Sequence, residues 1–177
     1  MKGKYIVAIA TLFAVGACTA AKGEEAKSDH ITRTTVPTLD LERYMGRWYE
    51  IARFDHRFER NLEHCEALYT LLPNGHVKVE NSGTDMRTGK RRTSYGHAKM
   101  GDAPGKLRVS FFLWFYSDYN ILALDGSYQW ALVGSRSPNY LWILSRTPTL
   151  PRATLRHILN EATARGYDIT KLHFVEQ

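Results

Sequence analysis

Eight short strand-like segments follow one another in this sequence, and this series constrains the fold more than any other feature. The segments are rich in β-branched and aromatic residues, and several alternate apolar with polar side chains. They comprise residues 46–54, 65–72, 76–81, 92–100, 106–112, 119–124, 128–133 and 140–145. Turn signals such as Pro73-Asn74-Gly75 and Asp125-Gly126 separate them, and no helical pattern interrupts them. The pattern therefore predicts an antiparallel all-β domain, either an up-and-down barrel or a sandwich.

One amphipathic helix is predicted after the last of these segments, over residues 151–165. Thr149 is the expected N-cap, and Gly166 is the expected residue just beyond the last turn. Apolar residues recur on one face at helical spacing, namely Leu155, Ile158, Leu159 and Ala162. Because residues 141–144 are apolar on both faces of their strand, one face needs a cover, which we expect this helix to provide. Residues 171–175 predict a short final strand.

The amino terminus is typical of an exported lipoprotein. Lys2 and Lys4 precede an apolar run of about 11 residues, which suits a signal peptide and is too short to span a bilayer. Val15-Gly16-Ala17-Cys18 resembles the bacterial lipobox, so we expect residues 1–17 to be removed and Cys18 to carry lipid. The absence of aspartate after the cysteine favours sorting to the outer membrane. The polar residues 18–36 predict a flexible tether, while an ordinary signal peptide with an incidental cysteine is the alternative.

The charge and the cysteine content limit what the exported domain binds and how it is stabilised. The chain has 24 Lys and Arg against 18 Asp and Glu, a formal charge of +6. Removal of Lys2 and Lys4 leaves 22 basic residues and a charge of +4, and no long basic run indicates a nucleic-acid partner. Cys65 is the only other cysteine, so we expect a domain without an internal disulfide, in which Cys65 is a small buried strand residue.

Three separated motifs resemble the signatures of the lipocalin family. Gly46-Arg47-Trp48 resembles the first, Ser117-Asp118-Tyr119 the second, with Ser in place of Thr, and Arg146 the third. Residues 48–60 and 140–149 are closer still to the bacterial outer-membrane lipocalins. The resemblance implies an all-β, eight-stranded antiparallel up-and-down barrel, with one carboxy-terminal helix packed outside it and a short final strand.

The resemblance also gives the signature residues structural roles. It implies that Trp48 closes one end of the barrel, that Arg146 lies across its ring, and that Gly46 lets the backbone pass closely. These three residues therefore identify the fold of a domain over residues 37–177 and are not expected to bind the ligand. Asp118 and Tyr119 complete the signature.

The family topology places a ligand inside the barrel and four loops at its open end, near residues 55–64, 83–91, 112–117 and 135–139. The apolar run over residues 111–116 is expected to line this mouth, contact the membrane, form a dimer contact or pack as a strand end. Alternation selects the candidate cavity residues Ala52, Phe54, Val77, Val79, Phe111, Trp114, Tyr119, Ile121, Trp130, Leu132 and Trp142. A slip of one residue would exchange the two faces of a strand. The candidate head-group contacts are Arg57, Arg60, Arg87 and Arg91.

The expected function is lipid binding at the outer membrane, on its periplasmic side. The resemblance implies a fatty acid or a lysophospholipid as ligand, stored or transported, and a homodimer as one oligomeric state. The seven histidines are scattered, and the sequence lacks Gly-x-Ser-x-Gly, His-Glu-x-x-His, CxxC and phosphate-binding loop motifs, so we expect neither catalysis nor a metal or cofactor. A lipid-modifying enzyme and a structural envelope lipoprotein with a filled barrel are the alternatives.

Overall fold

A computed structural model gives the fold and describes residues 30–57, 59–111 and 115–177. The predicted signal peptide, Cys18 and Trp114 lie outside the described residues. The strands are β1 Gly46–Phe54, β2 Leu62–Leu71, β3 Val77–Asp85, β4 Lys90–Met100, β5 Lys106–Ser110, β6 Ser117–Leu124, β7 Trp130–Gly134, β8 Leu141–Ser145 and β9 Leu172–Phe174. The helices are α1 Leu41–Tyr44, α2 Arg152–Ala164 and the short 3₁₀ helix η1 Ile169–Lys171.

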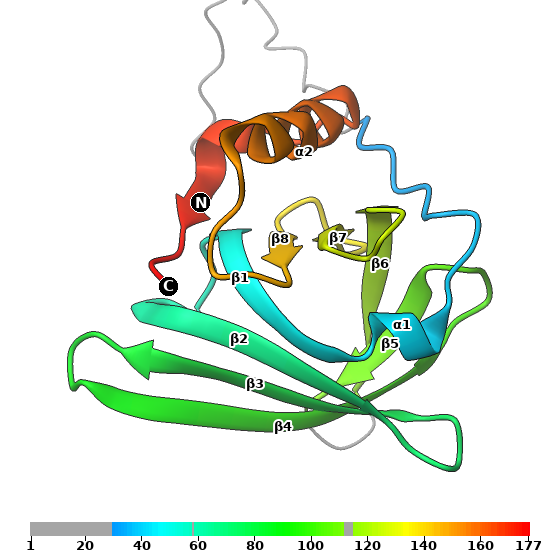
Figure 1. The fold of residues 1–177 in the computed structure, drawn as a ribbon, viewed down its shortest axis with the longest axis horizontal. Helices are drawn as coiled ribbons and strands as arrows, with labels where there is room; N and C mark the ends of the chain where they lie inside the picture. The colour runs from blue at the N-terminus through cyan, green and yellow to red at the C-terminus, as the bar shows by residue number, and fades with distance from the viewer. Residues whose placement is uncertain (1–29, 58, 112–114) are drawn as a thin grey trace, which may run out of the picture.

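The first eight strands form a closed antiparallel barrel (Figure 1). Strands β2 to β8 pair in chain order, and β1 pairs with β8 on one side and with β2 on the other, which closes the sheet. The ninth strand, β9, adds to β1 outside this ring. The predicted barrel is therefore confirmed over the sandwich. A closed sheet leaves few unpaired strand edges, so this arrangement also limits edge-to-edge association.

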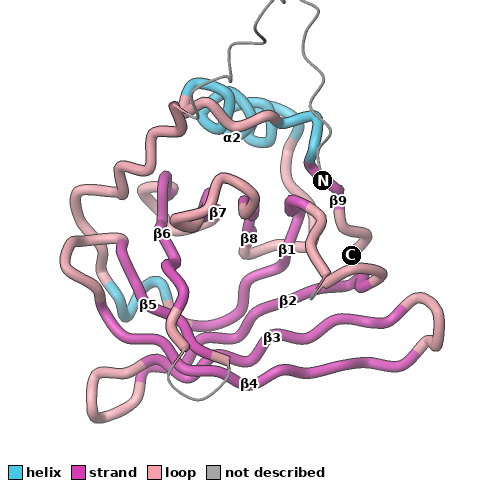
Figure 2. Tube along the Cα trace, turned by 180° about the vertical axis from the view of Figure 1, so that it is seen from behind, coloured by secondary structure: helices cyan, strands magenta, loops and turns pink. Residues whose placement is uncertain are grey.

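Helix α2 lies across one side of the barrel, as the apolar pattern predicts (Figures 1 and 2). Ile158 and Ala162 of α2 are fully buried, and they pack in one cluster with Leu141 and Ile143 of β8. We call this the outer cluster. Each fully buried aliphatic side chain contributes roughly 1.5–3 kcal/mol through the hydrophobic effect, so the outer cluster holds the helix on the barrel.

The beginning of α2 differs from the prediction, whereas its end agrees with it. Pro151, not Thr149, is the N-cap, and no side chain caps the helix there. Pro151 has an extended ψ of 141°, so the helical turn begins only at Arg152, and Thr149 lies too far upstream to cap it. At the other end Gly166 has a φ of +92° and donates a hydrogen bond to the Thr163 carbonyl.

Helix α1 is not predicted by the sequence pattern, because four residues are too few to show helical periodicity. Asp40 caps it by accepting a hydrogen bond from the Arg43 amide at 3.1 Å. The carbonyl of Tyr44, at its last residue, accepts a hydrogen bond from the Trp48 indole at 2.8 Å. Helix α1 therefore holds the Trp48 side chain in place near the start of β1.

Residues 30–36 pack on the domain, although the sequence places them in a flexible tether. The Thr32 amide donates to the Arg165 carbonyl at 2.9 Å, and the Arg165 guanidinium donates to the Thr34 carbonyl at 2.9 Å. The Val36 amide donates to the Ile121 carbonyl at 3.0 Å. Most of these hydrogen bonds join backbone groups. The polar side chains of this segment therefore do not indicate that it packs on the domain.

Candidate ligand site inside the barrel

One end of the barrel is closed by Trp48, which is fully buried. The guanidinium carbon of Arg146 lies 3.7 Å from the centre of the Trp48 ring, a cation–π contact. Arg146 also donates hydrogen bonds to the carbonyls of Arg43, Arg47 and Tyr128 at 2.8, 2.7 and 3.2 Å. One side chain thus joins α1, β1 and the β6–β7 turn beneath the barrel, which is the geometry that the sequence resemblance implies.

Gly46 has a φ of +89°, which residues with a side chain rarely adopt, so its backbone conformation favours glycine. A Cβ there would be in ordinary contact with the Arg146 guanidinium at 3.4 Å. Asp118 at the start of β6 forms an ion pair with Arg108 at 3.3 Å on the outside of the barrel.

The inner face of the barrel is lined by apolar and aromatic side chains. We call this the inner cluster: Tyr44, Trp48, Ala67, Tyr69, Val77, Val79, Ala98, Leu107, Ile121, Ala131, Val133 and Leu144, with Val109, Tyr119 and Trp142 packed against them. Five candidate cavity residues lie in this cluster, namely Val77, Val79, Tyr119, Ile121 and Trp142.

Four other candidates face away from the interior. Ala52, Phe54, Trp130 and Leu132 belong to the outer cluster beneath α2, where Phe54 packs on Tyr167 and Trp130 on His157. For β1 the cause is a register shift between Glu50 and Ala52, which reverses the faces of the residues that follow it.

Phe111 lies where β5 ends at the mouth. It is 45% exposed, and a Cβ on Gly96 of β4 would meet its ring at 2.8 Å. On the same wall the inner-face positions of β4 open to solvent: Ser94, which is in register with Asn81, is exposed. The barrel is therefore closed at the Trp48 end and open where β4 begins.

A buried charged network lies in the wall near the mouth. Arg53 is 1% exposed and donates to the Glu50 carboxylate at 2.7 Å and to the Glu59 and Leu62 carbonyls at 2.7 and 3.0 Å. The Glu59 carboxylate lies 4.0 Å from the Arg53 Nε. Two carboxylates therefore share one buried guanidinium.

The two carboxylates of this network titrate in opposite directions. Burial and the neighbouring Glu59 raise the pKa of Glu50 to about 8, against the attraction of Arg53. For Glu59 burial also disfavours the charge, but His56 at 2.9 Å and the Trp142 indole at 3.1 Å outweigh it, so its pKa is lowered. Near neutral pH, burial therefore keeps Glu50 protonated, whereas His56 and Trp142 keep Glu59 ionised.

Cys65 lies against this network and is 5% exposed, so its predicted place as a buried strand residue is confirmed. Its sulfur is 3.9 Å from the Arg53 Nη1, and a Cβ on Gly83 of β3 would lie 2.7 Å from it. Burial, with the nearby Glu50 carboxyl, raises the pKa of the Cys65 thiol well above its usual value.

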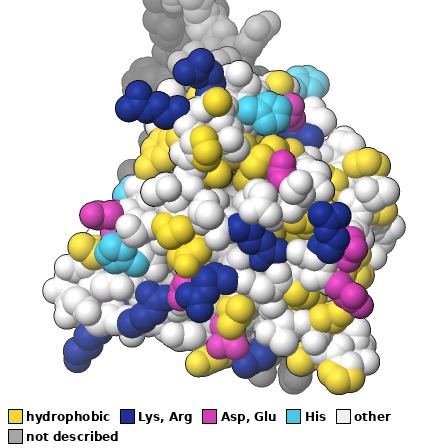
Figure 3. All heavy atoms as spheres, viewed as in Figure 1, with side chains coloured by type: hydrophobic (Ala, Val, Ile, Leu, Met, Phe, Trp, Pro, Cys, Tyr) yellow, Lys and Arg dark blue, Asp and Glu magenta, His cyan; other side chains and the backbone are white. Residues whose placement is uncertain are grey.

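The candidate head-group arginines lie around the mouth, but most are paired with carboxylates. Arg60 pairs with Asp55 at 3.0 Å, and Arg91 pairs with Glu66. Arg87 and Arg92 share the buried Asp85, at 3.2 and 2.9 Å. Arg57 is exposed. Figure 3 shows basic side chains gathered toward the end of the β3–β4 hairpin, with acidic ones among them. Of the four candidate head-group contacts, Arg60, Arg87 and Arg91 are therefore already paired with acidic side chains.

Three tyrosine hydroxyls meet on the inner face, and the sequence analysis names only one of these residues as a candidate. The Tyr119 hydroxyl lies 2.7 Å from that of Tyr44 and 3.1 Å from that of Tyr69. Burial raises the pKa of Tyr69 to about 12 and those of Tyr44 and Tyr119 well above the usual value. The alternation of β2 could have placed Tyr69 on the inner face, but nothing in the sequence signals that the three hydroxyls meet.

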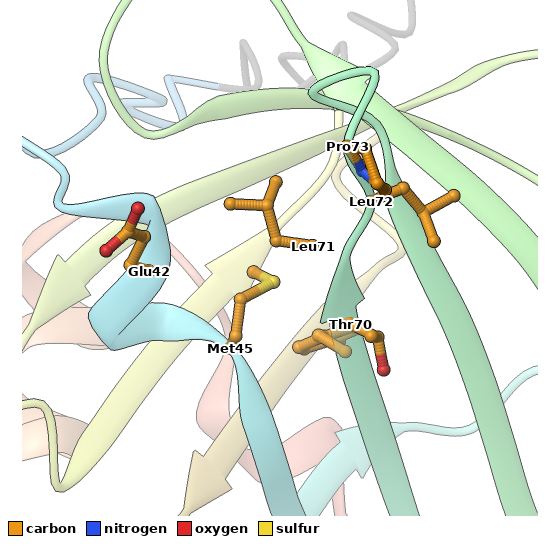
Figure 4. A pocket seen from close by; sticks show the side chains of 7 residues that line it. Glu42, Met45, Thr70, Leu71, Leu72 and Pro73 are labelled. Carbon is orange, nitrogen blue, oxygen red and sulfur yellow. The ribbon is translucent and has the colours of Figure 1, made fainter.

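An open pocket of about 550 Å³ lies at the closed end of the barrel, beside Tyr69 of the inner cluster. Met45 and Leu71 point toward one another across it, with Glu42 and Pro73 at its edges (Figure 4). It lies toward the end of β2 that is opposite the mouth, and Tyr69 is the one residue of the inner cluster that lines it.

A family model described as a lipocalin-like domain matches residues 39–177. The chain belongs to the lipocalin family. The lipocalin is 47% identical over 146 residues to the Outer membrane lipoprotein Blc of Escherichia coli (strain K12), a match that covers 81% of this chain and 82% of that protein. It is 39% identical over 145 residues to the protein of the same name from Vibrio cholerae, covering 80% and 85%. The structure of insecticyanin from the tobacco hornworm Manduca sexta matches with a TM-score of 0.69 at 20% identity, covering 82% and 85%, and supports the fold alone.

Both bacterial relatives of this lipocalin are named outer membrane lipoproteins, which agrees with the location that its amino-terminal sequence predicts. In the described part of the chain, no helix is long and apolar enough to cross a bilayer. Within the same residues, no three His, Cys, Asp or Glu side chains are grouped to hold a metal ion.

Proposed function

We propose that this lipocalin binds one fatty acid or lysophospholipid, with the acyl chain inside the barrel, and stores or transports it at the outer membrane. The observation that carries the proposal is the inner cluster, an apolar wall that is closed by Trp48 at one end and open near Ser94 at the other. Each methylene buried there contributes roughly 0.8 kcal/mol, so a long chain supplies enough free energy for tight binding without a covalent bond. The role is that of a carrier, and no step of chemistry on the lipid is required.

The mouth favours a polar head group that makes hydrogen bonds over one that relies on charge alone. The arginines of the β3–β4 hairpin retain a net positive charge, because Arg87 and Arg92 share the single carboxylate of Asp85. Their side chains are more than half exposed, so solvent weakens their attraction for a phosphate. We therefore expect only a modest contribution of charge to affinity.

Cys18 completes the proposal by anchoring the protein. Acyl chains on this cysteine would hold the protein on the membrane that contains its ligands. An anchored protein would meet its lipids without diffusing through the periplasm, which suits the proposed role in maintenance of the envelope.

Native mass spectrometry of the full-length lipoprotein, gently extracted from outer membranes, tests the binding proposal. We expect one co-purifying single-chain lipid per barrel, and the same spectra report whether the protein is the homodimer that the resemblance implies. In competition with a fluorescent fatty acid, a lysophospholipid should bind more tightly than the fatty alcohol of equal chain length. A consistently empty barrel that also fails to bind added lipid would contradict the proposal.

A further inference from the structure

The three tyrosines on the inner face hold more hydrogen-bond donors than their contacts use. Tyr44, Tyr69 and Tyr119 each carry one hydroxyl proton, and burial keeps all three protonated at neutral pH. Two hydrogen bonds join them, both through the Tyr119 hydroxyl. Two bonds use two protons, so one proton of the triad has no acceptor among the three oxygens.

An unused acceptor lies on the same wall. Among the described residues, the side-chain oxygen of Asn81 is buried without a hydrogen-bond partner. Asn81 is in register with Ala67, and Val79, two residues earlier on β3, is in register with Tyr69. Because alternate residues share a face, Asn81 and Tyr69 are diagonal neighbours on the inner face, with backbones about 7–8 Å apart.

A donor and an acceptor left unused in an apolar wall are costly, because each has lost its hydrogen bonds to water without a replacement. A carboxylate would satisfy the phenol but would place its charge beside the Asn81 oxygen, and an ammonium group would satisfy only Asn81. A hydroxyl both accepts and donates, so it matches both groups at once.

We propose that Tyr44, Tyr69, Tyr119 and Asn81 form a subsite for an uncharged hydroxyl on the buried part of the ligand. The subsite selects hydroxylated acyl chains over plain ones. This inference rests on the proposed function, since the hydroxyl reaches the wall only when the chain lies in the barrel. In this proposal the three tyrosines and Asn81 bind a hydroxyl on the acyl chain, whereas residues at the mouth bind the head group.

The test compares stearate with a series of hydroxystearates that carry the hydroxyl at different carbons. Affinities for delipidated protein are measured by displacement of a fluorescent fatty acid. We expect one hydroxyl position to bind at least as tightly as stearate, although a hydroxyl normally weakens transfer into an apolar site. Replacing Tyr44, Tyr69 and Tyr119 together by Phe should weaken that hydroxystearate about tenfold relative to stearate, the effect of one or two lost hydrogen bonds.

The triple Phe variant conserves shape and removes both partners of each bond, so it should fold, and its thermal melt verifies this. Asn81→Ala should also lower the affinity for that hydroxystearate relative to stearate. Tyr95→Phe, which alters an exposed tyrosine of β4, should leave this relative affinity unchanged. If stearate does not bind at all, the proposed function fails. If stearate binds but every hydroxystearate binds more weakly than stearate to the unaltered protein, or neither replacement changes their relative affinities, the subsite is overturned and the polar groups serve an ordered water only.

Discussion

At the scale of single residues, the wall near the mouth contains the least usual chemistry of this protein. Glu50 and Glu59 share the guanidinium of Arg53, and all three are buried or nearly so. Burial and the nearby Glu59 carboxylate raise the pKa of Glu50 more than Arg53 lowers it, so the proton stays on Glu50 to near pH 8. The sequence shows Glu50 on the face of Trp48, where a buried carboxylate needs a partner. The partner is Arg53, three positions on, because the register shift in β1 brings it to the same face.

This arrangement predicts a pH dependence of stability. Unfolded Glu50 loses its proton near pH 4.5, whereas folded Glu50 retains it to about pH 8. Unfolding therefore releases a proton between these values, and the stability contributed by Glu50 falls as the pH rises through this window. Relative to Glu50→Gln, the free energy of unfolding of the native protein should fall by more than about 1 kcal/mol from pH 4.5 to 8 and then level off. Urea unfolding of both proteins across this range measures it, and a difference that grows with pH would show an ionised Glu50.

At the scale of elements, the sequence locates the strands well and their faces poorly. Turn signals and alternation predict all eight barrel strands to within a few residues, because both are local properties. The inside and outside of β7 are not distinguishable in this way, since Trp130 and Leu132 on one face and Ala131 and Val133 on the other are all apolar. A register shift such as that of β1 depends on pairing with β8, which no single strand sequence contains. The tyrosine triad joins α1, β2 and β6, so it could not be predicted either.

Adjacent residues of β7 provide a matched test of the two faces. Leu132 and Val133 are both fully buried, the first in the outer cluster and the second in the inner cluster. Replacing either by Ala should lower the free energy of unfolding by about 1–4 kcal/mol. Only Val133→Ala should weaken stearate binding, by about threefold or more, because only this side chain belongs to the inner cluster, where we propose that the acyl chain lies. Equal losses of affinity in a displacement assay would show that the assignment of faces is wrong.

At the scale of the whole molecule, the family could be identified from sequence because its first and third signatures, which contain Trp48 and Arg146, meet in the fold. Arg146 donates to the carbonyl of Arg47, 99 positions away in the chain, and this contact needs every intervening strand to be paired correctly. The motifs therefore specify the closed end of the barrel. They say little of the mouth, where charges are paired by contacts such as those of Asp85 with Arg87 and Arg92.

The membrane anchor is tested separately from the barrel. Cys18→Ala should abolish incorporation of labelled palmitate and remove the protein from the outer-membrane fraction, because the thiol that accepts the lipid is missing. Cys65→Ala, the matched control, alters the buried cysteine and should leave labelling and fractionation unchanged. Label retained in Cys18→Ala would assign the modification to another residue.

The position of Cys65 affects how readily its thiol reacts with oxidants and labelling reagents. Its sulfur is screened by Arg53 and by the close approach of Gly83, and its proton is held tightly, so oxidants and alkylating reagents have little access to a reactive thiolate in the intact barrel. While the barrel is intact, the buried thiol is therefore shielded from accidental cross-linking to neighbouring molecules. A maleimide would therefore react with Cys65 only in molecules whose barrel has opened locally. The rate of labelling would measure how often the wall between β1 and β2 opens.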